Sequence, residues 1–339
     1  MGRARDIANV LSGSTNLTTD SELASFNYLT QGSASSTYTP LSSPVVGFKN
    51  KIINGSMRFW QRGTSFTTPA GAYTADRYKV TQNATSGTYV ASRQIASLDG
   101  FQYCMRLQRS SGQTATGAMI LGHALESIDV IPLQGKSIVF SFYARRGSNF
   151  SSSSNTITAQ VFTGTGTDGQ SFAALTSEVN HVNQTPTLID TWQRFTYTFN
   201  IPSNASEFRF NIFYLPTGTA STNDYFDITG IQLEIGNIVT DFEHKSFVNE
   251  LQMCERYYEL CIGGYYDGNV NSGSFYGGAT NFRTAKRATP TVTRISEVVD
   301  RIGNTPYSEH INAYGFRSMS QANGSLIQWT TLYRAEIEL

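Results

Sequence analysis

The sequence predicts an all-β protein: an antiparallel jelly-roll β-sandwich, then one short helix, then a smaller C-terminal β domain. Three observations lead to this prediction. Apolar side chains recur at every second position in many segments, and Gly, Ser, Thr and Asn are frequent between those segments. Aromatic residues make up 12% of the chain and charged residues only 15%, a balance typical of β-rich proteins. Helical periodicity is lacking between the alternating segments, which favours a sandwich over βαβ units.

The alternating segments each predict a strand with one buried face. From the first to the last in the sandwich, the predicted inward sets are Tyr103, Met105 and Leu107; Ile138, Phe140, Phe142 and Ala144; Ile157, Ala159 and Val161; Phe195, Tyr197, Phe199 and Ile201; Phe208, Phe210, Ile212 and Tyr214; Ile231, Leu233 and Ile235. The pattern resumes after residue 263, and Trp329, Thr331, Tyr333 and Ala335 alternate with polar residues near the end of the chain.

Four regions follow from these changes in pattern. Residues 1–46 are rich in Ser, Thr and Gly and contain Pro40 and Pro44, so we expect an extended arm that orders on a partner. Residues 47–243 form the predicted jelly roll, residues 244–262 a linking helix and residues 263–339 the C-terminal β domain.

The linking helix is predicted from apolar residues at steps of four and three, a coiled-coil-like seam. The seam consists of Phe247, Leu251, Cys254, Tyr258 and Cys261. Ser246 precedes it as an N-cap candidate. A helix this short is marginal alone, so it packs either across its own sheet or against symmetry mates around an axis.

Charge composition excludes several classes of protein. Lys and Arg together number 25, as do Asp and Glu, so the formal net charge is zero. A chain without basic excess lacks the main energetic term for nucleic-acid binding and for attraction to an anionic membrane. The longest apolar runs fall short of a membrane-spanning segment, so no membrane insertion is expected. The three cysteines, Cys104, Cys254 and Cys261, do not form a disulfide framework and fit small buried residues made in a reducing cytoplasm.

Catalytic and cofactor motifs are missing from the sequence, so we expect no enzyme activity and no cofactor. The four histidines lack metal-ligand spacing, and neither a nucleophile elbow nor a P-loop is present. Paired carboxylates for glycoside hydrolysis need proximity in space rather than in sequence; the acids considered are Asp224, Asp227, Glu234, Asp267 and Asp300. We expect Asp224, Asp227 and Glu234 to face solvent on strands, with Asp227 and the Asn54–Gly55–Ser56 carbonyls as an alternative structural Ca²⁺ site.

Aromatic residues among small polar ones in the Gly-rich C-terminal region suggest a sugar-binding surface. A Tyr ring stacks on the apolar face of a sugar while Asn and Asp bond its hydroxyls. The predicted carbohydrate-binding residues are Tyr265, Tyr266, Asp267, Phe275, Tyr276 and Asn281. The alternative is that these rings pack in a small core or at a subunit interface.

Several segments, in this order, resemble tail-fibre-like proteins of marine and cyanobacterial phages that carry a jelly roll like that of carbohydrate-binding modules. The segments are residues 2–11 (GRARDIANVL), 51–63 (KIINGSMRFWQRG), 73–78 (YTADRY), 231–236 (IQLEIG), 241–244 (DFEH), 254–258 (CERYY), 286–293 (KRATPTVT) and 335–339 (AEIEL).

This resemblance implies a virion fibre or tail-tip protein, a homotrimer that attaches the particle to host surface glycans. It implies that residues 1–46 dock to other tail or baseplate proteins, that the C-terminal domain is the receptor-binding tip, and that the helical seam forms the trimer interface. The chain lacks the long shaft of such fibres. The alternatives are a polysaccharide-degrading hydrolase (a depolymerase) and a purely structural head or tail decoration protein.

Overall fold

The computed structural model describes residues 48–83, 87–269, 271–300, 306–322 and 326–339, without the side chains of residues 264–269, 297–300 and 326–330. The predicted arm, residues 1–46, lies outside the described residues and stays a prediction. Residues from Lys49 to Leu339 form one compact unit.

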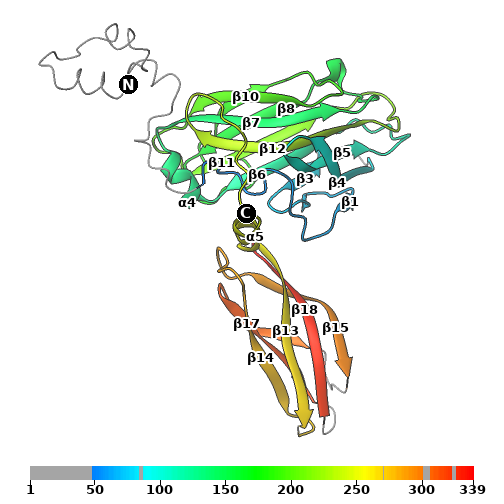
Figure 1. The fold of residues 1–339 in the computed structure, drawn as a ribbon, viewed down its shortest axis with the longest axis vertical. Coiled ribbons are helices and arrows are strands. Elements are labelled where there is room, and N and C mark those ends of the chain that lie inside the picture. Colours follow the sequence, from blue (N-terminus) through cyan, green and yellow to red (C-terminus); the bar gives the residue numbers. More distant parts are fainter. Residues whose placement is uncertain (1–47, 84–86, 270, 301–305, 323–325) are drawn as a thin grey trace, which may run out of the picture. The chain divides into compact units, whose positions relative to one another are not determined.

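The first part of this unit is a sandwich of two antiparallel six-stranded sheets within the described residues (Figure 1). Sheet A contains, in spatial order, β1 (Ser65–Thr67), β4 (Tyr89–Leu98), β5 (Phe101–Arg109), β12 (Tyr225–Ile235), β7 (Ser137–Arg146) and β10 (Gln193–Asn200). Sheet B contains β2 (Ala72–Tyr73), β3 (Lys79–Gln82), β6 (Met119–Leu125), β11 (Glu207–Tyr214), β8 (Thr158–Gly164) and β9 (Val179–Gln184). The chain crosses repeatedly between the sheets, as in a jelly roll, which confirms the predicted fold class.

The core of the sandwich lies between the sheets and is built from the residues that alternation predicted. Phe140 and Phe142 of β7 meet Phe210 of β11 in this core, and the Phe140 and Phe210 ring centroids are 5.0 Å apart. Phe195 and Tyr197 are partly buried against the same cluster because β10 is the edge strand of sheet A. The pattern fails at two strand ends: Ile235 is 48% exposed, and Tyr103 is half-buried and outside this core.

The second part of the unit is a smaller pair of three-stranded antiparallel sheets (Figure 1). One contains β13 (Tyr258–Asn269), β18 (Leu326–Glu336) and β15 (Thr291–Asp300), and the other contains β14 (Phe275–Asn281), β17 (Gly315–Gln321) and β16 (Tyr307–Asn312). A small core joins the two sheets and consists of Cys261, Phe282, Phe316, Tyr333 and Ala335. This confirms the predicted C-terminal β domain.

The helices of the described chain are short: α4 (Ser127–Val130), the 3-10 turns η1 (Ile131–Leu133) and η2 (Ser153–Asn155), and α5 (Phe247–Glu255). None of them is long and apolar enough to span a membrane. In α5 the Ser246 hydroxyl accepts a hydrogen bond from the Asn249 amide at 3.3 Å, as the predicted N-cap.

The predicted extent of the linking helix is wrong. It ends at Glu255, and strand β13 begins at Tyr258, which pairs with Glu336 of β18. The β13–β18 ladder supplies the backbone hydrogen bonds that a longer helix would have made internally. Tyr258 and Cys261 therefore lie on a strand, although their spacing continues that of the helix.

The prediction that all five residues of the helical seam form a trimer interface is also wrong. Cys254 is fully buried with Ile53, Phe59 and Tyr257 of the same chain, while Tyr258 is 4% and Cys261 5% exposed. Their own chain covers these three side chains, so they cannot line a subunit interface. Of the predicted set, Phe247 is 56% exposed and Leu251 is half-buried; for these two the prediction stays open.

A buried ionic cluster ties the last residues of the chain to the sandwich; we call Arg62, Asp76, Arg77, Glu336 and Glu338 the junction cluster. Arg62 Nη2 donates to Glu336 Oε1 at 3.0 Å and to Glu338 Oε1 at 2.8 Å. Arg77 pairs with Glu338 and donates to the Ala124 carbonyl at 2.8 Å. Arg62 and Arg77 thus share Asp76, Glu336 and Glu338 as counter-charges. Glu336 is 35% exposed, and the other four side chains are at most 10% exposed.

Asp76 is a fully buried acid of this cluster. Its carboxylate accepts from the Gln61 amide at 3.1 Å and from Gln61 Nε2 at 2.8 Å. Burial raises its pKa from 3.8 to about 6, although the positive charge of Arg62 acts in the opposite direction. The folded chain therefore binds a proton here between pH 4 and 6 that the unfolded chain does not, and this group adds stability as the pH falls.

We predict that Asp76→Asn reduces the gain in unfolding free energy on going from pH 7 to pH 5. The expected difference from wild type is about 1 kcal/mol, measured by chemical denaturation at both pH values. Asp99→Asn, at an exposed position, is the matched control and should follow the wild type. An Asp76→Asn protein with the wild-type pH dependence would contradict the assignment.

Candidate functional site

A continuous row of side chains crosses the outer face of sheet A. Residues that face each other on neighbouring strands lie on the same side of a sheet. The register pairs Ser65 with Ser92, Ser92 with Arg106, Arg106 with Asp227, and Asp227 with Arg145. The neighbours of Asp227 along β12, Phe226 and Ile228, point into the core, so the row faces outward. We call Ser92, Arg106, Asp227 and Arg145 the arginine row.

Asp227 is the centre of this row and is fully buried. Its Oδ1 accepts from Arg106 Nε at 2.7 Å, and its Oδ2 accepts from Arg106 Nη2 and from Arg145 Nε, both at 3.0 Å. One carboxylate thus lies between two guanidinium groups that are 19% and 22% exposed. Burial alone would lower the pKa of Arg106, but the hydrogen bonds and charge of Asp227 raise it.

Two aromatic rings cover the faces of these guanidinium groups. The Arg106 guanidinium lies 3.4 Å from the centroid of the Tyr225 ring, and that of Arg145 lies 4.8 Å from the Trp192 ring. Such contacts favour the cation and restrict its rotation. Because Asp227 holds one edge of each guanidinium and a ring covers one face, both arginines are fixed in place.

A groove of about 570 Å³ opens beside the row, over β1, β4 and β5. Its lining is mostly hydroxyl and amide groups: Thr64, Ser65, Val90, Ser92, Arg93, Gln94, Gln108, Arg109, Ser110, Ser111 and Thr222. Gln94 Nε2 donates to the Ser92 hydroxyl at 2.9 Å and Gln108 Nε2 to the Thr222 carbonyl at 2.7 Å. Ser92 belongs to both groove and row, so the two features form one surface.

The β4–β5 hairpin bends over the same face and bounds this surface. Trp192 Nε1 donates to the Ala96 carbonyl of β4 at 2.8 Å. The Phe101 ring of β5 lies 5.5 Å from that of Tyr143 on β7, two strands away in the sheet. These contacts bury Cys104, whose thiol pKa is raised first by burial and then by the nearby Asp227 carboxylate. The hairpin thus lies beside the arginine row, whose Arg106 and Arg145 side chains stay 19% and 22% exposed.

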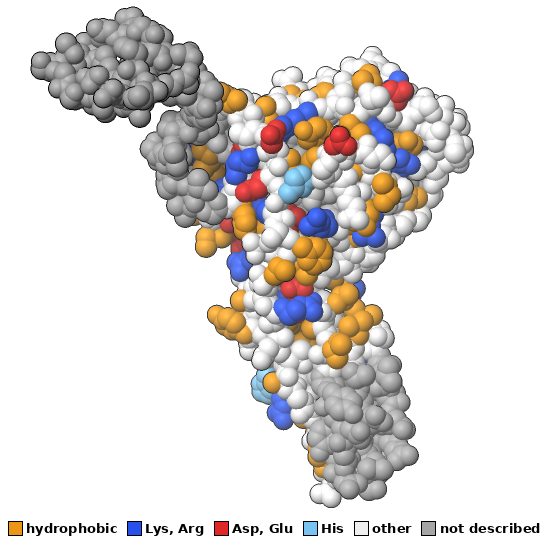
Figure 2. All heavy atoms as spheres, viewed as in Figure 1, with side chains coloured by type: hydrophobic (Ala, Val, Ile, Leu, Met, Phe, Trp, Pro, Cys, Tyr) orange, Lys and Arg blue, Asp and Glu red, His pale blue; other side chains and the backbone are white. Residues whose placement is uncertain are grey.

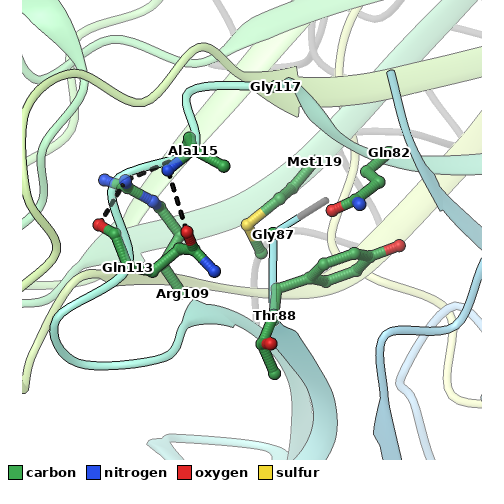
Figure 3. A pocket seen from close by; sticks show the side chains of 9 residues that line it. Gln82, Gly87, Thr88, Arg109, Gln113, Ala115, Gly117 and Met119 are labelled. Atoms are coloured by element: carbon green, nitrogen blue, oxygen red, sulfur yellow. Dashed lines mark hydrogen bonds between the residues drawn. The ribbon is translucent and has the colours of Figure 1, made fainter. Parts of the chain in front are cut away.

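A second pocket, at one end of the sandwich, is too small for a ligand. Its volume is about 10 Å³, the space of a single water molecule. Figure 3 shows the Arg109 side chain directed at the loop that carries Gln113 and Ala115. Arg109 donates to both carbonyls at 2.8 Å and to Asp224 Oδ2 at 3.0 Å. This arginine fastens loops together rather than binding a substrate.

The expectation that Asp224, Asp227 and Glu234 face solvent is wrong, since all three are at most 1% exposed. Asp224 pairs with Arg109 at 3.0 Å, and Glu234 Oε1 accepts from Gln232 Nε2 at 2.9 Å and from the Thr240 amide at 3.0 Å. Such burial is stable because each carboxylate has its own donors. The side chains of Asp267 and Asp300 lie outside the described residues.

The alternative calcium site at Asp227 is wrong for a similar reason. Both carboxylate oxygens are occupied by arginine donors, while the Asn54 and Gly55 carbonyls accept from Met57 and Ile231 amides. In the described part of the chain, no group of three or more His, Cys, Asp and Glu side chains is placed to hold a metal ion. Cys104, Cys254 and Cys261 are free and buried, as predicted.

The predicted sugar-binding residues of the C-terminal domain are only partly described. Tyr265, Tyr266 and Asp267 belong to the backbone of β13, but their side chains lie outside the described residues. Phe275 is 52% exposed and Asn281 is also exposed, at the opposite end of β14. Six residues of strand span about 20 Å, so these two do not contact one sugar ring. The hydroxyl of Tyr276 accepts from the Asn271 amide at 3.0 Å.

Sequence reasoning missed the arginine row. Alternation places Arg106, Asp227 and Arg145 on outward faces, but nothing in the sequence shows which strands pair or in what register. The equal numbers of acidic and basic residues also gave no indication of a local excess of positive charge. Figure 2 shows charged side chains of both signs dispersed among uncharged ones on the face drawn.

Comparisons with known proteins give weak structural similarities only. No protein-family model matches the chain, and no curated protein matches it in sequence. The enzymatically active domain of bacteriophage CBA120 tailspike protein 4 is similar over 56% of this chain and 22% of its own, with 12% identity and a TM-score of 0.36. This chain therefore corresponds to less than a quarter of that domain.

Two carbohydrate-binding modules give similar values. TmCBM61, solved in complex with β-1,4-galactotriose, is similar over 56% of this chain and 100% of its own, with 12% identity and a TM-score of 0.33. The C-terminal family 22 module of Clostridium thermocellum Xyn10B is similar over 53% of this chain and 99% of its own, with 13% identity and a TM-score of 0.31. Similarities this weak do not decide what this chain binds.

We predict that Asp227→Asn lowers the free energy of unfolding by about 2 kcal/mol, because two partly buried guanidinium groups lose their shared counter-charge. Chemical denaturation measures this loss, and Asp241→Asn, at an exposed position, is the control. A neutral effect of Asp227→Asn would show that the row contributes nothing to the fold.

Proposed function

We propose that this chain is a non-enzymatic adhesin that binds glycans on the outer face of sheet A. The observation that carries the proposal is the groove of about 570 Å³ beside the arginine row. The groove offers mostly hydroxyl and amide groups. The adjoining arginine row adds fixed guanidinium groups and the half-buried rings of Tyr225 and Trp192. Sugars need such a surface because one side of the ring is apolar and the edges carry hydroxyls.

The carboxylates of the sandwich support binding rather than catalysis. A glycosidase needs one carboxyl that donates a proton and a second that acts as base or nucleophile, both in contact with the sugar. Asp224, Asp227 and Glu234 are instead buried and hydrogen-bonded to arginine, amide or hydroxyl donors. Among these three, none has an oxygen free to meet a glycosidic bond.

The virion assignment extends the same proposal and is supported by the sequence resemblance. The chain would be a homotrimeric component of the particle surface, with residues 1–46 attached to other tail or baseplate proteins. Three weak sites on one rigid particle would raise the overall affinity well above that of one sugar contact. A decoration protein without a receptor is the alternative, and glycan binding distinguishes the two.

We predict that Tyr225→Ala lowers glycan binding at least tenfold, because the ring that covers the Arg106 guanidinium and holds it in place is lost. Binding of the full chain to a glycan array, followed by titration of the bound glycan, measures the effect. The control is Tyr314→Ala, since Tyr314 is 73% exposed in the C-terminal domain.

Other outcomes of this experiment are informative. If Phe275→Ala abolishes binding and Tyr225→Ala does not, the site is on the C-terminal domain and the groove proposal is wrong. If no glycan binds, the decoration protein is favoured. Release of reducing ends from the bound polysaccharide would establish a hydrolase instead.

The oligomeric state is tested separately by light scattering of the full chain at micromolar concentration. A homotrimer of the 37.3 kDa chain would scatter with a mass of about three times that value. Phe247→Asp, at the exposed start of α5, should favour the monomer if this helix contributes to the interface. A wild-type monomer would contradict the trimer.

A further inference from the structure

We propose that the glycan bound by this face carries carboxylate groups, and that Arg145, with Arg106, binds those carboxylates. This inference rests on the proposed function and narrows its ligand to an acidic polysaccharide with uronic acid residues. The observation that carries it is the pair of fixed guanidinium groups in the arginine row, each of which has hydrogen-bond donors that the protein does not use.

The unused donors can be counted atom by atom. Arg106 donates to Asp227 through Nε and Nη2, and Arg145 through Nε alone. Among the described residues, Nη1 of Arg106 and both Nη atoms of Arg145 have no hydrogen-bond partner. Both side chains are about one-fifth exposed, 19% for Arg106 and 22% for Arg145, so solvent or a ligand reaches them.

Rigidity distinguishes these arginines from ordinary surface arginines. An exposed arginine loses rotamer freedom when it binds, which offsets much of the gain. Arg106 is held by Asp227 and by the Tyr225 ring at 3.4 Å, and Arg145 by Asp227 and the Trp192 ring at 4.8 Å. Both side chains lose their conformational entropy when the protein folds rather than when a ligand binds. The free donors are therefore presented to a ligand in one geometry.

The charge of the face favours an anion. The row contains two guanidinium groups and one carboxylate, so one positive charge is in excess. In the adjacent region Arg194 donates to the Ser141 hydroxyl at 3.1 Å and to the Thr240 carbonyl at 2.6 Å. It has no carboxylate partner in the part of the chain that the structure describes. The other buried acid of this face, Glu234, has Lys49 at 3.9 Å. The arginine row together with Arg194 therefore carries more positive than negative charge.

The donor geometry favours a carboxylate over a neutral group. Two parallel N–H donors of one guanidinium match the two oxygens of a carboxylate, and the free Nη pair of Arg145 has that arrangement. Ser92, Gln94 and Gln108, which line the adjoining groove, suit sugar hydroxyls. A polymer of uronic acids presents both kinds of group along one chain.

The test compares wild-type full chain on polygalacturonate, alginate, methyl-esterified polygalacturonate, dextran and dextran sulfate by affinity electrophoresis at physiological salt. We expect polygalacturonate or alginate to bind at least tenfold more tightly than dextran, and esterification to remove that advantage. Arg145→Gln should lower the affinity for whichever uronate polymer binds the wild type at least tenfold, because the paired donors are lost. The variant should still fold, because Arg106 still neutralises Asp227.

The controls separate local from general electrostatics. Arg317→Gln removes the same charge from a 50% exposed arginine of the C-terminal domain and should leave binding unchanged. Arg145→Lys keeps the charge but not the paired donors, and should bind more weakly than wild type; it also serves if Arg145→Gln does not fold.

Each contrary result has a distinct meaning. Equal binding of the esterified and free polymers, or wild-type binding by Arg145→Gln, would overturn the inference while the groove remains a glycan site. Dextran sulfate binding as tightly as the uronates would show a general anion surface and would also overturn it. If neither uronate polymer binds but a neutral glycan does, only this inference fails; if no glycan binds at all, the proposed function fails.

Discussion

The structure depends on the cost of burying charge inside a β-sheet protein. A carboxylate removed from water without a partner costs several kcal/mol, whereas one with fixed donors is tolerated. Asp224, Asp227, Glu234 and Glu338 are each buried or nearly so, and each has arginine, amide or hydroxyl donors. These arrangements decide where loops are fastened, how the end of the chain attaches to the sandwich and which surface retains unused donors.

The same interaction serves different purposes at different places. At Arg109 every contact is made to a loop carbonyl, a hydroxyl or Asp224, and the guanidinium is 2% exposed. In the junction cluster, Arg62 and Arg77 hold Glu338 close to the end of the chain. In the arginine row the guanidinium groups are only partly used. An arginine that can bind a ligand differs from one that only holds segments of the chain together in two ways: its side chain is partly exposed, and some of its N–H donors have no partner in the protein.

The C-terminal domain contrasts with the sandwich. Among its described side chains, five form the buried core, while Ile262, Phe275 and Tyr314 are 72%, 52% and 73% exposed. Small sheets bury little apolar area for their length, so the β13–β18 ladder and the junction cluster stabilise this domain together. The short α5 packs on Ile53 and Phe59 and so joins the start of the sandwich to the start of β13.

The sequence by itself determined the all-β class, the two β domains, the inward faces of most sandwich strands and the burial of the cysteines, because side-chain alternation is a local property of a strand. The helix predicted from the sequence was too long, because Tyr258 and Cys261 continue a helical spacing but lie on a strand that pairs with β18. Only the tertiary structure placed Arg106, Asp227 and Arg145 in one row, because residues 106, 145 and 227 meet through strand register, which the order of residues along the chain does not specify.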